Sequence, residues 1–261
     1  GKTPISIRGE IQQEYVTRAN DGGFADGDQI GVFIANRDGG QPAMLKATGN
    51  HADNVCFTYG EETGQWTGSY DIYWKDNATS VDAYSYYPFN SSITSVDALP
   101  FAIKQKQQVG TDANSVTGYE ASDFLWAKAE NVAPGTVISL KHNHIMAGLE
   151  VNLVEGEGFQ NGELASLENI VLVENTCLNT VINLTTGTVT LSDNAVNAIV
   201  PQQTGTTWRA IVAPQSVAAG KALLTITVDG VNYQYSRNTD MTFIAGKLHK
   251  FTIKVDKRQP I

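Results

Sequence analysis

The sequence is poor in cysteine and in positive charge. Its 261 residues include two cysteines, Cys56 and Cys177, which lie far apart and form no CxxC pair. This spacing gives no support for a metal site or a dithiol redox centre, and we expect buried free thiols, with a single disulfide as the open alternative. The formal net charge is -9 at pH 7, with no basic run. Nucleic acid and anionic membrane surfaces are therefore not expected partners, since both require clustered Lys and Arg.

The sequence also lacks a long hydrophobic run. No window approaches the roughly 18 apolar residues that a membrane-spanning helix requires, and the chain begins with Gly1-Lys2 in place of Met. We therefore expect a mature or trimmed form whose export signal, if there is one, is missing.

Signatures of catalysis and cofactor binding are absent as well. There is no Gly-x-Ser-x-Gly motif, no phosphate-cradling loop and no dinucleotide fingerprint. His142 and His144 would share one face of a strand, but two ligands do not make a metal site, and structural histidines are the expected role. The sequence therefore predicts a non-enzymatic protein without cofactor or metal. A glycosidase is the least favoured alternative, because it requires two carboxylates facing each other across a cleft, about 5 to 10 Å apart.

What the sequence does contain is an all-β pattern. Nearly every apolar segment is short, β-branched or aromatic, and bounded by Gly, Asn, Asp or Thr. About seven strands per half, with no convincing helix, predict two sandwich-like domains in series. The strongest break is Pro134-Gly135, which places the domains at residues 1–135 and 136–261. The candidate strands after the first cover residues 30–35, 55–59, 66–74, 81–89, 99–103, 124–127, 138–153, 170–173, 181–184, 189–191, 208–213, 223–228, 231–235 and 248–255.

The clearest alternation is at the N-terminus. Ile5, Ile7, Ile11 and Tyr15 occupy odd positions while charged and amide side chains occupy the even ones, so residues 5–16 are expected to form one long, half-buried strand. Arg18 follows in a turn-rich connector that would be open to a trypsin-like protease. The hypothesis is a detachable strand with a cleavage site, and the alternative is an ordinary first strand followed by an ordinary loop.

Two further patterns carry predictions. The apolar residues change from even to odd positions near His144, which indicates a bulge or bend there. Trp66, Tyr70 and Trp74 lie in an aromatic-rich stretch and are candidate glycan-stacking residues, although core packing is the commoner role of such rings.

Several segments together resemble the fimbrillin family of Bacteroidales, in family order along the whole chain. These segments are Thr17-Arg18-Ala19, Phe24-x-x-Gly27-Asp28-x-Ile30-Gly31-Val32-Phe33, Ile72-Tyr73-Trp74, Ala83-Tyr84-Ser85-Tyr86-Tyr87-Pro88-Phe89, Ser122-Asp123-Phe124-Leu125-Trp126-Ala127, Leu140-Lys141-His142-Asn143-His144-Ile145-Met146-Ala147, Val212-Ala213-Pro214-Gln215 and Ala245-Gly246-Lys247-Leu248-His249-Lys250-Phe251-Thr252-Ile253.

The resemblance implies two transthyretin-like β-sandwich domains in tandem, export as a lipoprotein, and display at the outer membrane in a fimbria. It also implies assembly by strand exchange, in which an Arg-specific protease removes the first strand and another subunit fills the groove. On this chain Arg18 would be the cleavage residue, and Ile5, Ile7, Ile11 and Tyr15 the anchors of the removable strand. The only membrane contact would be through a lipid anchor outside this chain.

Partners and position in the fimbria are less defined. The expected partners are other fimbrial subunits, host or bacterial surface glycans or proteins, and the protease. Gly148 stands where the family often has Lys, and residues 256–261 are the only ones after the last candidate strand. These departures count against a repeating stalk subunit and leave tip, anchor and accessory roles open. The alternative function is a surface carbohydrate-binding lipoprotein that does not polymerise.

Overall fold

The computed structural model describes residues 2–12, 23–108 and 116–258, and in this part of the chain nearly all regular structure is β. The two helices there are short: α1 (Gly118–Ser122) and α2 (Glu163–Ser166). The all-β class predicted from the sequence is confirmed. None of the helices in the described residues is long and apolar enough to cross a bilayer.

Contacts group the chain into two compact units. Unit 1 contains Gly1–Phe101, Phe124–Ile145 and Val181–Val189, and unit 2 contains Ala102–Asp123, Met146–Thr180 and Thr190–Ile261. A division into folding domains at residue 135 stays a prediction. The contact-based units are drawn differently, because segments from the second half of the chain belong to unit 1.

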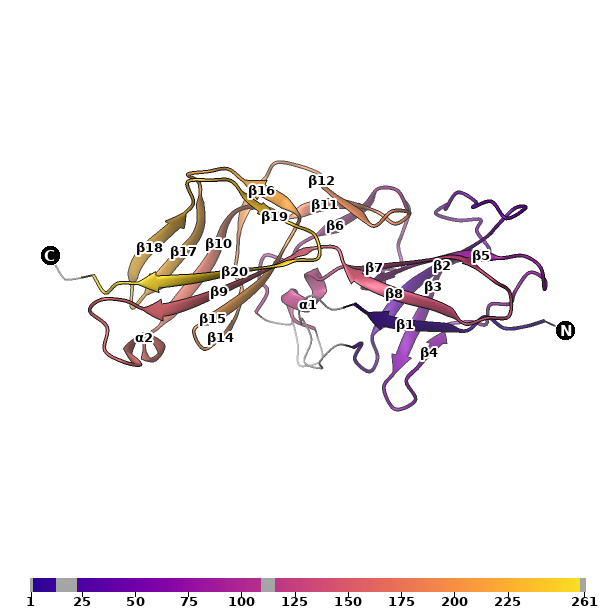
Figure 1. Cartoon of the computed structure of the whole chain (residues 1–261), viewed down its shortest axis with the longest axis horizontal. Coiled ribbons are helices and arrows are strands. Elements are labelled where there is room, and N and C mark those ends of the chain that lie inside the picture. The colour runs from indigo at the N-terminus through magenta and orange to yellow at the C-terminus, as the bar shows by residue number, and fades with distance from the viewer. Residues whose placement is uncertain (1, 13–22, 109–115, 259–261) are drawn as a thin grey trace. The chain divides into compact units, whose positions relative to one another are not determined.

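Unit 1 is built on a seven-stranded sheet with the order β1-β8-β7-β5-β2-β3-β4. Its central strands are buried on both faces, and every residue of β5 is buried, as expected for strands covered on two sides. Its strands are β1 (Ile7–Ile11), β2 (Gln29–Asn36), β3 (Ala52–Gly60), β4 (Gln65–Gly68), β5 (Val81–Tyr87), β7 (Leu125–Val132) and β8 (Ile138–His144) (Figure 1).

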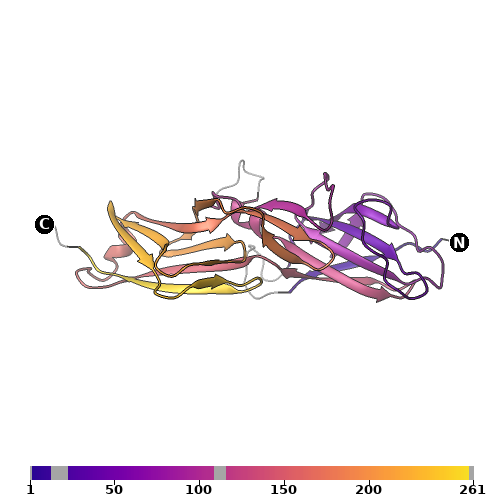
Figure 2. The same cartoon turned by 90° about the horizontal axis from the view of Figure 1, so that it is seen from above.

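Unit 2 contains two four-stranded sheets, and Figure 2 shows their strands from a second direction. The first has the order β13 (Val196–Ile199), β10 (Asn169–Cys177), β17 (Ala222–Val228), β18 (Val231–Ser236). The second has the order β14 (Gln202–Thr204), β15 (Thr207–Val212), β9 (Ala147–Glu155), β20 (Leu248–Val255). A three-stranded sheet, most of whose residues belong to unit 1, has the order β12 (Thr188–Leu191), β11 (Asn179–Asn183), β6 (Leu99–Ala102). A two-stranded sheet in unit 2 pairs β16 (Gln215–Val217) with β19 (Met241–Phe243).

Local sequence signals account for several details. The bend predicted near His144 is confirmed, since β8 ends at His144 and β9 begins at Ala147. Asp229 and Gly230 both have positive φ, 48° and 79°, in the tight turn between β17 and β18, as a type I′ hairpin requires. The first strand is shorter than predicted: the described part of residues 5–16 is a strand only over Ile7–Ile11, and residues 13–16 lie outside the described residues.

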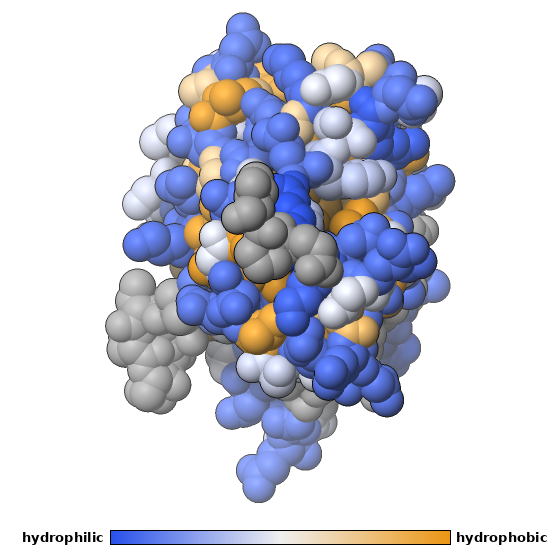
Figure 3. Space-filling view, turned by 90° about the vertical axis from the view of Figure 1, so that its left-hand side faces the viewer, coloured by the Kyte–Doolittle hydropathy of each residue, from blue (hydrophilic) through white to orange (hydrophobic). Residues whose placement is uncertain are grey.

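The face of the molecule drawn in Figure 3 is mostly hydrophilic. In the space-filling view, hydrophobic side chains form small areas separated by hydrophilic ones over the face in view (Figure 3).

Cys56 and Cys177 are free thiols. Burial raises the pKa of the Cys177 thiol, which lowers its reactivity because the thiolate is the nucleophilic form.

Candidate functional site

Strand β1 forms one edge of the unit 1 sheet. Within the described residues its partner in that sheet is β8, which it meets in parallel from Ile7 opposite Ile138 to Ile11 opposite His142 (Figure 1). The other six strands are joined to one another by pairs that do not involve β1. Loss of β1 would therefore leave the remaining six-stranded ladder intact.

The sequence alternation explains how β1 is anchored. Ile5, Ile7 and Ile11 are 8%, 9% and 6% exposed and belong to the core cluster of unit 1, together with Ile138 and Leu140 of β8. The intervening Arg8 and Glu10 are exposed. Burying an aliphatic side chain of this size stabilises a fold by about 1.5 to 3 kcal/mol. Ile7 and Ile11 of β1, and Ile5 just before it, therefore add to the attachment that the backbone ladder with β8 provides.

The other predicted residues of this segment cannot be placed. Tyr15, the fourth predicted anchor, and Arg18, the predicted cleavage residue, lie outside the described residues. Their roles stay predictions.

The residues just before β1 also form backbone hydrogen bonds with the stretch that follows β4. The Ile5 amide donates to the Ile72 carbonyl at 2.7 Å, and the Trp74 amide donates to the Thr3 carbonyl at 2.9 Å. These two bonds attach the beginning of the N-terminal segment to the stretch after β4. Beyond Ile5 this pairing stops, and β1 and β4 diverge around a cavity.

The cavity between β1 and β4 has a volume of about 460 Å³. Residues 5–8, 64–68 and 70–72 line it, with Phe57 and Val137. Trp66 crosses it: the indole Nε1 donates to the Gly9 carbonyl at 3.4 Å, and the ring packs against Phe24 and Tyr59 with centroids 4.8 and 5.1 Å away.

A buried histidine connects β1 to the core. His142 is fully buried; its Nδ1 lies 3.1 Å from the Glu10 carbonyl oxygen and its Nε2 lies 2.7 Å from the Ser85 hydroxyl. A carbonyl only accepts, so the partners assign the proton to Nδ1 and let the neutral ring accept from Ser85 at Nε2. His142 thus ties the backbone of β1 to β5, which is the structural role expected for this histidine.

The structure separates the three candidate glycan-stacking residues. Trp74 is buried in the core cluster with 6% exposed, so its ring offers no face to a sugar. Trp66 is half-buried and already packed against two aromatic rings. Tyr70, 55% exposed, is the one of the three with an open ring, and it lies at the cavity between β1 and β4.

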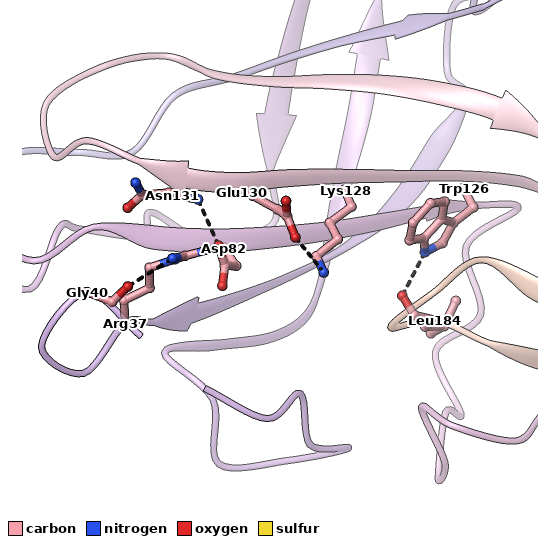
Figure 4. Close-up of polar contacts among 8 residues, drawn as sticks. All are labelled: Arg37, Gly40, Asp82, Trp126, Lys128, Glu130, Asn131 and Leu184. Carbon is pink, nitrogen blue, oxygen red and sulfur yellow. Dashed lines mark hydrogen bonds and ion pairs between the residues drawn. The ribbon is translucent and has the colours of Figure 1, made fainter. Parts of the chain in front are cut away.

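A second set of polar contacts involves the central strands β5 and β7 of the same sheet. The buried Asp82 accepts from Arg37 Nε at 2.9 Å and from the Asn131 amide at 2.8 Å, while Lys128 and Glu130 form a more exposed ion pair at 3.0 Å (Figure 4). These contacts fix strands within the unit. Among the described residues no group of three or more His, Cys, Asp or Glu side chains is arranged to hold a metal.

Sequence reasoning missed the contact between Trp66 and Gly9. A β-carbon added at Gly9 would lie 2.9 Å from Trp66 Nε1, so the indole needs glycine there. One signal was available: Gly9 interrupts the row of isoleucines on the odd positions 5, 7 and 11, and glycine inside a strand often marks a close approach.

Comparison with known proteins identifies the family. A sequence model described as fimbrillin-like matches residues 17–261. The chain belongs to the fimbrillin-like family. This membership implies a fimbrial subunit at the cell surface, in agreement with the resemblance seen in the sequence. The match begins after β1.

Solved structures give the same fold. A candidate cell adhesion protein from Bacteroides uniformis has a TM-score of 0.73 at 20% identity, with 97% of this fimbrillin-like chain and 93% of that chain covered. A second candidate cell adhesion protein, from Bacteroides ovatus, has a TM-score of 0.72 at 17% identity, covering 98% and 93%. A fimbrial protein from Bacteroides ovatus has a TM-score of 0.57 at 16% identity and covers 100% of this chain and 52% of that one. A comparison with curated protein sequences found no match.

Proposed function

We propose that this fimbrillin-like chain is a non-enzymatic structural or adhesive subunit of a bacterial fimbria that assembles by strand exchange. A protease cuts after Arg18, β1 leaves, and a strand from another subunit fills the vacated position beside β8. The observation that carries the proposal is that β1 is an edge strand bound to one strand of its sheet, with three isoleucines buried in the core.

Removal of β1 would expose a strand edge and apolar pockets that favour binding of another strand. The backbone edge of β8 becomes unpaired and the pockets of Ile5, Ile7 and Ile11 become empty. An exposed edge next to an open apolar slot favours addition of another strand, which supplies main-chain hydrogen bonds and alternate side chains.

The finer parts of the proposal come from the family resemblance. They are two transthyretin-like sandwich domains in tandem, a lipoprotein displayed at the outer membrane, cleavage at Arg18 by an Arg-specific protease, and Ile5, Ile7, Ile11 and Tyr15 as anchors of the removable strand. The alternative, a surface carbohydrate-binding lipoprotein, has less support, because Trp74 is buried and Trp66 is largely covered, which leaves Tyr70 as the open ring of the three candidates.

Limited proteolysis tests the proposal. We expect an Arg-specific protease to cut the purified protein after Arg18, as read by mass spectrometry, and the cleaved protein to form polymers with partner subunits in size-exclusion chromatography. The control is Arg18→Lys, which should resist the Arg-specific protease but yield to trypsin, because trypsin also cuts after Lys. Resistance of the wild-type bond, or a cleaved product that stays monomeric with partner subunits present, would contradict strand exchange by this route.

A further inference from the structure

The outer edge of β4 faces the cavity with backbone groups that form no ladder with another described strand. The Ser69 amide donates to the Cys56 carbonyl, and this bond shows which residue pairs of the β3–β4 ladder are hydrogen-bonded. Because hydrogen-bonded pairs alternate in an antiparallel ladder, Thr67 and Gln65 bond to β3, while the N–H and C=O groups of Trp66 and Gly68 point away from it. They point toward β1.

Within the part of the chain that the structure describes, the edge of β1 that faces β4 is also unpaired over most of its length. The Ser6 carbonyl accepts from Ile138 and the Gln12 amide donates to His142, so even-numbered residues bond to β8. The backbone groups of the odd-numbered residues point to the other side, as the bond from Ile5 to Ile72 illustrates. Among the described residues, the contact that bridges the two edges further along is the 3.4 Å hydrogen bond from Trp66 to Gly9.

The cavity between these edges suits an extended chain better than a compact ligand. Two rows of backbone donors and acceptors face each other across it, and its mouth is flanked by exposed apolar side chains, Tyr70 at 55% and Val137 at 50%. Arg8 and Asp71 are the charged residues of the lining and have opposite signs. The site therefore favours main-chain pairing and apolar contact over recognition of a charged ligand.

We propose that this cavity is where a strand from another fimbrial subunit first docks, pairing with Trp66 and Gly68 of β4 while β1 is still in place. Exchange is then associative, and the incoming strand displaces β1 stepwise. This inference rests on the proposed strand exchange and adds the route by which the new strand arrives.

The reason for this route is the burial of the isoleucines. If β1 left first, the pockets of Ile5, Ile7 and Ile11 would all open to water before any replacement arrived. A strand already held along β4 can fill these pockets as they empty, so less apolar surface is exposed at any moment. The long hydrogen bond of Trp66 is the first contact that must yield.

Exchange kinetics test the proposal. Protein cleaved after Arg18 is mixed with a fluorescent synthetic peptide copying residues 3–16, and uptake is followed by anisotropy. Docking before departure predicts a rate that rises in proportion to peptide concentration. A rate that does not depend on concentration and equals the spontaneous departure rate of β1 would overturn the inference, while the proposed function would stand.

A large side chain at the cavity lining tests whether the peptide docks there. Val137→Trp should slow uptake about tenfold, the equivalent of 1.4 kcal/mol of lost docking, and leave the spontaneous departure of β1 unchanged. Val196→Trp is the control, since Val196 is 53% exposed in unit 2, close to the 50% of Val137. Equal uptake rates for the two variants would contradict docking in the cavity.

Uncleaved protein separates this inference from the proposed function. The peptide should shift the NMR signal of the Trp66 indole N–H, assigned by its loss in Trp66→Phe, because the indole lies in the cavity. A shift without uptake after cleavage would contradict strand exchange and leave docking intact. No shift at saturating peptide would overturn docking whatever cleavage does.

Discussion

The indole of Trp66 lies directly against the backbone of Gly9, and its Nε1 donates to the Gly9 carbonyl at 3.4 Å. This contact joins β1 to β4, the two edges of a seven-stranded sheet. The ring also packs on Phe24, which lies edge-on to His142 at 5.2 Å. The strand that is proposed to leave is thus covered by an aromatic cluster.

Gly9→Ala should loosen β1. The added β-carbon would lie 2.9 Å from Trp66 Nε1 and would force the ring away, and overpacking of this kind costs about 1 to 3 kcal/mol. Urea unfolding should show a lower free energy of unfolding. Gly23→Ala is the control, because nothing lies within 4 Å of its added β-carbon. Equal stabilities for the two variants would show that the indole is not held in this position.

Ile7→Ala should destabilise unit 1 by about 2 to 4 kcal/mol, since it removes a buried aliphatic side chain and leaves a cavity. Ile7 is 9% exposed. Arg8→Ala, next along the strand on the exposed face, should change stability by less than about 0.5 kcal/mol. The measurement is chemical unfolding of both variants. After cleavage at Arg18, the Ile7 variant should also lose its N-terminal segment faster; an unchanged departure rate would mean that this isoleucine does not anchor it.

Arg37→Met should cost about 3 to 5 kcal/mol, because it leaves the buried carboxylate of Asp82 without its guanidinium partner. Asp82 is fully buried, and Arg37 contacts it through two nitrogens at 2.9 Å (Figure 4). Lys128→Met breaks a pair whose Glu130 is 63% exposed and should cost at most about 1 kcal/mol. Thermal unfolding compares the two variants. Similar losses would mean that burial does not decide the strength of these pairs.

Glu150→Gln should reduce the pH dependence of stability in unit 2. Burial raises the pKa of Glu150, but hydrogen bonds from Arg209 and Asn152 outweigh it, so the pKa lies below its ordinary value of 4.5. A carboxyl whose pKa is lowered on folding stabilises the fold above 4.5, and that stabilisation is lost as the pH falls through the lowered pKa. The free energies of unfolding of wild type and variant should therefore differ most above pH 4.5 and converge below the lowered pKa. Unfolding measured between pH 3 and about 7 checks this. A constant difference would contradict the assignment.

Part of the fold was predictable from local pattern. Period-2 alternation placed Ile7 and Ile11 on the buried face of an edge strand, and Asp229-Gly230 specified a tight hairpin turn. The parity change at His144 located the boundary between β8 and β9. The short strands β13, β14, β16 and β19 were missed, because three or four residues are too few for an alternation to be read.

The aromatic residues show where local pattern fails. Trp74 is buried and Tyr70 is 55% exposed, although four positions separate them and both lie among polar and aromatic neighbours. Which ring is covered depends on where residues 3–5 pair with residues 72–74, and nothing near either aromatic residue encodes that pairing.

The sequence by itself determined the strand periods, the turns and the inward face of β1, because these depend on residues that are neighbours along the chain. Only the tertiary structure decided that β1 pairs with β8, more than a hundred residues away, and that β4 lies across a cavity from it. These relationships depend on long-range strand pairing, which many alternating segments satisfy equally well until packing of the whole core selects one.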